Sequence, residues 1–148
     1  DDACACYYGG FNVTNNYRRN LIFRHPAPNN LQAIILLPKS RRRGNLKNLK
    51  DFKGAFEKAW EFAKSSDYWN ASILNGLATS SILNSNPELI LKLIKKGAIG
   101  ATISGNGPSI VAIVRKGHGS NIKKEFSSLE GNVIVSNINN KKAEVHEV

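Results

Sequence analysis

An α+β fold, with helices packed on a largely antiparallel sheet, is the architecture that this sequence predicts. Short apolar runs typical of strands occupy both ends of the 148-residue chain, and residues with helical spacing fill its middle. A glycine-rich segment separates two of the later strands. Strands, then helices, then strands and a further helix are typical of helices packed on one sheet. At 41% hydrophobic residues the chain fits one domain over residues 1–148 and can bury a core.

The first part of the chain predicts one short helix and three strands. Gly9-Gly10 ends the helix, Asn15-Asn16 supplies a turn because asparagine tolerates left-handed backbone, and Pro26 and Pro28 precede the third strand. The apolar run of that third strand is unbroken, which predicts burial on both of its faces. These elements span residues 2–8 for the helix and 11–14, 19–24 and 31–37 for the strands.

Residues 38–44 form a basic loop, and the helical and strand patterns resume after it. Asp67 and Asn86 are suitable N-caps for two of the helices, and Gly97 after two lysines is the expected stop of the second. We expect helices over residues 49–63, 68–81, 87–96 and 121–129, and strands over 98–103, 109–114, 133–137 and, weakly, 142–148.

The formal net charge of +10 raises the question of a polyanionic partner. Lysines between residues 47 and 64 alternate with Glu57 and Glu61, which is typical of a solvated helix face, and no nucleic-acid recognition motif accompanies the charge. No apolar run approaches the ~20 residues of a membrane helix, and the N-terminus lacks a secretory pattern. We therefore expect a cytoplasmic protein that binds neither nucleic acid nor membrane.

The segment Ser104-Gly105-Asn106-Gly107 between two strands is the strongest candidate for chemistry. Glycines let a backbone approach a ligand closely, and the N–H groups of such a turn can bind an anion such as phosphate. The surroundings fit neither the Walker phosphate loop nor a dinucleotide fingerprint, because both need a strand that leads into a helix. Taken alone, the segment is equally well explained as a tight hairpin.

Two further segments pair with it. The chain opens with Asp1-Asp2-Ala-Cys-Ala-Cys-Tyr-Tyr-Gly9-Gly10, and the segment from Gly97 to Pro108 reads Gly-Ala-Ile-Gly-Ala-Thr-Ile-Ser-Gly-Asn-Gly-Pro. Together they resemble the GHMP kinase superfamily, which includes galactokinase, homoserine kinase and mevalonate kinase, and the second resembles its third conserved motif. With Tyr68–Leu77, the chain looks most like the C-terminal half of the archaeal-type shikimate kinases, over nearly its whole length.

The resemblance implies a site and a reaction, the ATP-dependent phosphorylation of a shikimate hydroxyl. Family members with a catalytic aspartate place it seven residues before the glycine pair, which is Asp2 here, with Asp1 beside it. A carboxylate there can orient the acceptor hydroxyl and take its proton. Ser104–Gly107 would then contact the nucleotide.

Shikimate carries a carboxylate, which a guanidinium can bind bidentately. Arg41, Arg42 and Arg43 of the basic loop are the candidates, although a solvated charge run explains them equally well. The three histidines are scattered without ligand spacing, so no metal site is expected from the residues of this chain.

The superfamily's ATP-phosphate loop, Pro-x-x-x-Gly-Leu-Gly-Ser-Ser-Ala, does not occur in this sequence. We expect this chain to be the C-terminal domain of the enzyme and inactive alone, with ATP and Mg²⁺ bound mainly by an N-terminal half. A homodimer is left open. The alternatives are a homoserine or mevalonate-like kinase, a non-catalytic ligand-binding α+β module, and electrostatic capture of RNA.

Overall fold

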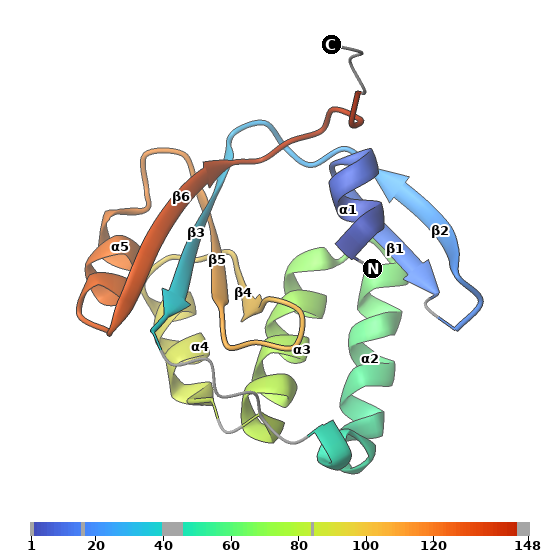
Figure 1. Ribbon diagram of the computed structural model, residues 1–148, viewed down its shortest axis with the longest axis horizontal. Coiled ribbons are helices and arrows are strands. Elements are labelled where there is room, and N and C mark those ends of the chain that lie inside the picture. The colour runs from blue at the N-terminus through green and yellow to red at the C-terminus, as the bar shows by residue number, and fades with distance from the viewer. Residues whose placement is uncertain (1, 16, 40–45, 84, 145–148) are drawn as a thin grey trace. The chain divides into compact units, whose positions relative to one another are not determined.

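The computed structural model describes residues 2–15, 17–39, 46–83 and 85–144, with the side chains of residues 2 and 46–48 left out. Its helices are α1 (Asp2–Tyr8), α2 (Lys53–Lys64), α3 (Tyr68–Ile82), α4 (Pro87–Lys95) and α5 (Ser120–Ser127), with a 3₁₀ helix η1 (Leu46–Phe52) before α2. Its strands are β1 (Phe11–Asn15), β2 (Asn20–His25), β3 (Leu31–Pro38), β4 (Gly100–Ile103), β5 (Ile110–Arg115) and β6 (Gly131–Asn137). The predicted α+β class is confirmed (Figure 1).

The chain divides into two compact units. The smaller one, residues 1–31 and 137–148, contains α1 and the antiparallel hairpin β1–β2. The larger one, residues 32–136, contains the other helices and a four-stranded sheet in the order β4-β5-β3-β6. β4 pairs with β5 in antiparallel register, and β3 and β6 run in opposite directions (Figure 1).

The core of the larger unit lies between the sheet and helices α4 and α5. Its fully buried side chains come from both helices and from the two central strands: Ile34, Leu36, Ile90, Leu93, Ala112, Val114, Ile122 and Phe126. Alternate residues of β3 and β5 contribute to it, as expected of strands with one face on a core. This packing fixes the position of the β4–β5 hairpin.

Helix caps predicted from the sequence are confirmed. The Asp67 carboxylate accepts from the N–H of Asn70 at the start of α3, and the Asn86 side chain accepts from the N–H of Glu88 at the start of α4. Gly97, in left-handed backbone with a φ of 101°, follows α4. Among the described residues, no helix has both the length and the apolar character that crossing a membrane requires.

Two predicted details are wrong, and the predicted turn at Asn15-Asn16 is described only in part. β1 ends at Asn15, whose side chain accepts from the N–H of Arg18, and the described part of the turn ends with Arg19, in left-handed backbone at a φ of 50°. Asn16, the other residue of the predicted turn, lies outside the described residues. The helix predicted over 49–63 is divided into η1 and α2. The predicted last strand is absent over 142–144, the described part of that tail.

Strand β3 also differs from its prediction of burial on both faces. Ile34 and Leu36 are fully buried on the core side, whereas Ile35 is half-buried and Leu37 is 37% exposed. Helices α4 and α5 cover only the Ile34 face. The apolar run therefore predicted the strand correctly, but it did not predict how many faces of the strand are buried.

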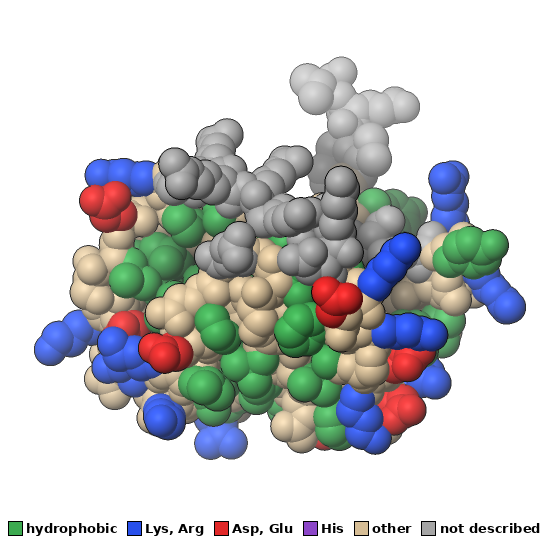
Figure 2. Space-filling view, turned by 90° about the horizontal axis from the view of Figure 1, so that it is seen from below, with side chains coloured by type: hydrophobic (Ala, Val, Ile, Leu, Met, Phe, Trp, Pro, Cys, Tyr) green, Lys and Arg blue, Asp and Glu red, His purple; other side chains and the backbone are tan. Residues whose placement is uncertain are grey.

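Surface charge is of mixed sign on the face shown in Figure 2, where Asp and Glu side chains lie among the Lys and Arg side chains. On α2, Lys58 pairs with Glu61 at 2.8 Å and Lys53 with Glu57 at 3.6 Å. Exposed pairs of this kind add little to stability, because water and salt screen the attraction between the two charges. They do match the interpretation of this helix as a solvated charged face.

Candidate active site

The glycine segment is a hairpin loop between β4 and β5. The N–H of Ser104 donates to the carbonyl of Ser109 at 2.8 Å, and the N–H of Gly107 donates to the carbonyl of Ser104 at 2.9 Å. Gly105 and Gly107 adopt φ values of 54° and 70°, which L side chains rarely adopt. The loop is thus the tight glycine turn that the sequence left as one of its two explanations.

The same turn leaves backbone donors at its tip. Ser104, Gly105 and Asn106 are exposed, and no described residue accepts a hydrogen bond from the N–H of Gly105 or Asn106. Adjacent unpaired N–H groups in a turn with left-handed residues are a suitable cradle for an anion. The structural and the ligand-binding interpretations of the loop are therefore compatible.

Helix α3 supports β4, the strand that leads into the loop. A Cβ atom placed on Gly76 would lie 2.6 Å from the carbonyl oxygen of Ala101, and one on Gly100 would lie 2.7 Å from the hydroxyl of Ser72. The amide of Asn75 also donates to the hydroxyl of Thr102 at 3.3 Å. Because Gly76 has no side chain, the backbone of α3 packs directly against the backbone of β4 just before the loop, while Gly100 leaves room for the side chains of Ser72 and Trp69.

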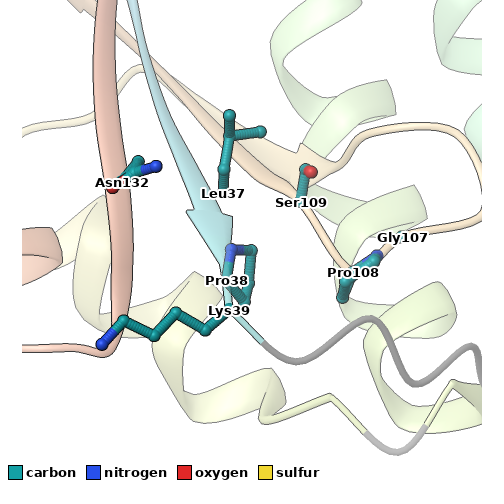
Figure 3. Close-up of a pocket in the computed structure, with 7 residues that line it drawn as sticks. All are labelled: Leu37, Pro38, Lys39, Gly107, Pro108, Ser109 and Asn132. Atoms are coloured by element: carbon teal, nitrogen blue, oxygen red, sulfur yellow. The ribbon is translucent and has the colours of Figure 1, made fainter.

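A pocket of about 430 Å³ adjoins the end of the loop (Figure 3). It is lined by the end of β3, by the residues that enter β5 and by the start of β6: Leu37, Pro38, Lys39, Gly107, Pro108, Ser109 and Asn132. In Figure 3 the hydroxyl of Ser109 and the amide of Asn132 lie on opposite sides of Leu37, as the strand order requires.

The chemistry of the pocket suits a polar, anionic or hydroxylated ligand. Lys39 supplies a cation, Ser109 a hydroxyl and Asn132 an amide, while Leu37 and Pro108 supply apolar surface. None of the described lining residues carries a carboxylate. A pocket with a few convergent polar groups on an apolar wall is typical of small-molecule sites.

The structure describes some of the predicted site residues and leaves others outside the described range. Ser104, Gly105, Asn106 and Gly107 form the loop, but only Gly107 lines the pocket. The arginines at 41–43, Asp1 and the side chain of Asp2 lie outside the described residues, although α1 begins at Asp2 as predicted. Lys39, near the start of the predicted basic loop, does line the pocket, although no motif in the sequence marks it.

Backbone conformation and close packing explain why residues 9 and 10 are both glycine. These residues have φ values of 63° and 71°, and the C-terminal segment passes close to Gly9, where an added Cβ would lie 2.8 Å from the carbonyls of Asn139 and Lys141. The N–H of Gly10 donates to the carbonyl of Asn139 at 2.8 Å. Larger residues would push this segment away from the end of α1.

Two polar side chains that sequence reasoning missed hold this unit together. Arg24 donates from Nε to the carbonyl of Gly9 at 3.0 Å and from Nη2 to that of Asn140 at 2.6 Å. The Asn140 side chain accepts from the N–H of Ala27 at 2.8 Å and donates to the carbonyl of Ala27 at 2.7 Å. Arg24 thereby positions the end of α1, the helix that begins at Asp2. Their only signal is polarity, because their partners are distant in sequence.

Glu125 is a buried carboxylate of α5 in the larger unit. Its oxygens lie 2.6 Å from Nζ of Lys92 and 3.4 Å from Nζ of Lys96, both at the end of α4. The hydrogen bond from Lys92 lowers the pKa of Glu125, and Lys96 lowers it further, against the opposing effect of burial. This pairing joins the two helices beneath the sheet.

Comparison with known proteins agrees with this architecture. The family model described as GHMP kinases C terminal matches residues 54–131. The chain is 33% identical over 146 residues to a shikimate kinase of Methanothrix thermoacetophila, covering 97% of this chain and 50% of that protein. It is also 33% identical over 148 residues to a shikimate kinase of Methanosarcina acetivorans, with the same coverage.

Among solved structures, homoserine kinase from Cytophaga hutchinsonii matches with a TM-score of 0.61 and 22% identity, covering 93% of this chain and 51% of that one. A putative homoserine kinase from Listeria monocytogenes matches with a TM-score of 0.59 and 16% identity, covering 97% and 54%. At these identities the likeness shows the fold alone. The chain spans about half the length of the relatives it matches. It belongs to the GHMP kinase family, in which residues 54–131 match the C-terminal domain.

Proposed function

We propose that this chain is the C-terminal domain of an ATP-dependent shikimate kinase, which converts shikimate to 3-phosphoshikimate in the cytoplasm. The observation that carries the proposal is similarity along nearly the whole chain, at 33% identity, to archaeal proteins named shikimate kinase. The glycine loop and its adjoining polar pocket support it independently, because they offer anion donors and a small-molecule cavity side by side.

In this proposal the glycine loop contacts the nucleotide. ATP would supply the phosphoryl group. The N–H groups of Gly105 and Asn106, which donate to no described residue, fit phosphate oxygens, and their fixed hairpin geometry means that little reorganisation is needed as negative charge develops. We assign the ligands of Mg²⁺ mainly to an N-terminal half and to the phosphates.

The acceptor is assigned to the carboxylate and cations of this chain. Asp2 orients the reacting hydroxyl and takes its proton, with Asp1 beside it. Arg41, Arg42 and Arg43 are the candidates for holding the shikimate carboxylate. Lys39 begins the same loop at the pocket wall, so it adds a positive charge near that carboxylate.

A coupled assay of ADP release tests the proposal in the complete enzyme, with an N-terminal half that carries the ATP-phosphate loop. Shikimate, homoserine and mevalonate are compared at equal concentration. Turnover with shikimate alone is expected, and turnover confined to homoserine or mevalonate would contradict the assigned acceptor. The 148-residue chain alone is expected to be inactive, and robust turnover by it would contradict the division of the site between two halves.

The role of Asp2 has its own test. Asp2→Asn keeps the size of the side chain but removes the proton acceptor, so kcat should fall by about 10² or more. Asp51→Asn is the matched control, because Asp51 is an exposed residue of η1. Equal activity of both variants would favour a non-catalytic module.

A further inference from the structure

A second cavity lies at the other end of the β4–β5 hairpin. It has a volume of about 330 Å³ and is formed by the turn after α4 and by the turn between β5 and α5. β5 is six residues long, so the cavity and the glycine loop are separated by ~17 Å of strand. The proposed kinase reaction does not use it.

Positive charge dominates this cavity. Lys96, Arg115 and His118 line it, and none of the described lining residues carries a carboxylate. Lys96 is the more distant partner of Glu125, at 3.4 Å against 2.6 Å for Lys92, so its charge is only partly neutralised. Within the described residues, the Arg115 guanidinium has neither an ion pair nor a hydrogen bond. Cations gathered in a concave surface attract small anions more strongly than isolated surface charges do.

The backbone around the cavity is open to a ligand. Gly97 and Gly117 have φ values of 101° and 84°, and a Cβ atom on either would meet no atom within 4 Å. The ring Nδ1–H of His118 donates to the carbonyl of Lys116 at 3.2 Å, which holds the imidazole at the rim. Ser120 and Asn121 complete the wall with a hydroxyl and an amide.

We propose that this cavity binds a small phosphate anion, either inorganic phosphate or a phosphate monoester of a hydrophilic metabolite. Three cationic or protonatable groups suit a ligand with two negative charges better than a ligand with one carboxylate. The planar guanidinium of Arg115 can bind two phosphate oxygens at once. Of the lining residues that the structure describes, Ile99 alone has a hydrophobic side chain, which disfavours an apolar ligand. The volume exceeds that of phosphate alone and is at the lower end of the range for small-molecule sites.

The test is an NMR titration of the ¹⁵N-labelled chain with inorganic phosphate and, separately, glycerol 3-phosphate, at constant ionic strength. Saturable shifts are expected at the amides of Gly97, Gly117 and Ser120, with a dissociation constant of about 1 mM or tighter. Tighter binding of the ester would identify a metabolite as the ligand, and equal binding would identify the free ion. Non-saturating shifts in both titrations would overturn the proposal.

Three variants locate the site. Arg115→Ala should weaken binding about tenfold, whereas Lys124→Ala removes one charge from an exposed position of α5 outside the lining and should leave it unchanged. Asn121→Asp places a carboxylate in the cavity but also in the first turn of α5, where negative charge favours the helix. If Asn121→Asp binds phosphate more weakly than the wild type without being less stable, the added carboxylate repels the ligand, and the cavity is the binding site. Unchanged phosphate affinity in Arg115→Ala and Asn121→Asp would refute the proposed site, even if phosphate still shifts the amides of Gly105 and Asn106 in the glycine loop.

Discussion

Replacing Gly76 by alanine tests how closely helix α3 is packed against the strand that leads into the glycine loop. The new Cβ would lie 2.6 Å from the carbonyl oxygen of Ala101 and 2.8 Å from Cα of Thr102. The first distance is about 0.8 Å shorter than the 3.4 Å at which ordinary contact begins. Both opposing atoms belong to the backbone of β4, so no side-chain rotation relieves the overlap, and helix and strand must separate.

The expected energy follows from two opposing effects. Alanine gains about 1 kcal/mol over glycine from helix propensity. Overpacking against fixed atoms costs about 1–3 kcal/mol, and the backbone partners at Ala101 and Thr102 place this case at the upper end. Gly76→Ala should therefore lower the free energy of unfolding by about 2 kcal/mol. It should also disturb the Asn75–Thr102 hydrogen bond next to the loop.

Gly54→Ala is the matched control, because Gly54 lies in α2 and an added Cβ there meets nothing within 4 Å. That variant should be more stable than the wild type by about 0.5–1 kcal/mol. Urea unfolding followed by tryptophan fluorescence measures both, since Trp60 and Trp69 are the two tryptophans and both belong to the larger unit. If Gly76→Ala were as stable as Gly54→Ala, the proposed backbone contact between α3 and β4 would be refuted.

Two further predictions concern the polar links within each unit. Glu125→Gln should reduce the free energy of unfolding at pH 7 by about 1 kcal/mol, because Lys92 and Lys96 lose their shared carboxylate but stay partly hydrated. Since pairing lowers the pKa of Glu125, the wild type should keep its greater stability above pH 4.5 and lose it as the pH falls through the lowered pKa. Urea unfolding at several pH values measures this difference, and identical midpoints of the two proteins at every pH would contradict the pairing. Asn140→Ala should raise the hydrogen-exchange rate of the Ala27 amide about tenfold or more, because that N–H loses its acceptor. Asn139→Ala is the control and should leave the exchange rate of the Ala27 amide unchanged. Equal rates in both variants would contradict the link between Asn140 and Ala27.

The sequence determined those elements whose causes are local. Asp67 and Asn86 cap their helices through N–H groups two or three residues away, and Gly97 ends α4 because it accepts left-handed backbone. The glycine segment was correctly placed between two strands for the same reason, since its φ requirements lie within a few residues. The roles of Asp2 and of the arginines at 41–43 stay predictions, because they derive from resemblance and their side chains lie outside the described residues.

Only the tertiary structure decided which distant residues meet. Asn140 contacts Ala27 from 113 positions away, and Gly76 lies against Ala101 because α3 folds back onto β4. Lys39 joins Gly107 and Asn132 in one pocket because β3 lies between β5 and β6, an order that no local pattern encodes. Periodicity and caps are properties of a few neighbouring residues, whereas strand order and packing depend on the free energy of the whole core. The sequence therefore located the glycine loop, and the fold supplied the pocket beside it.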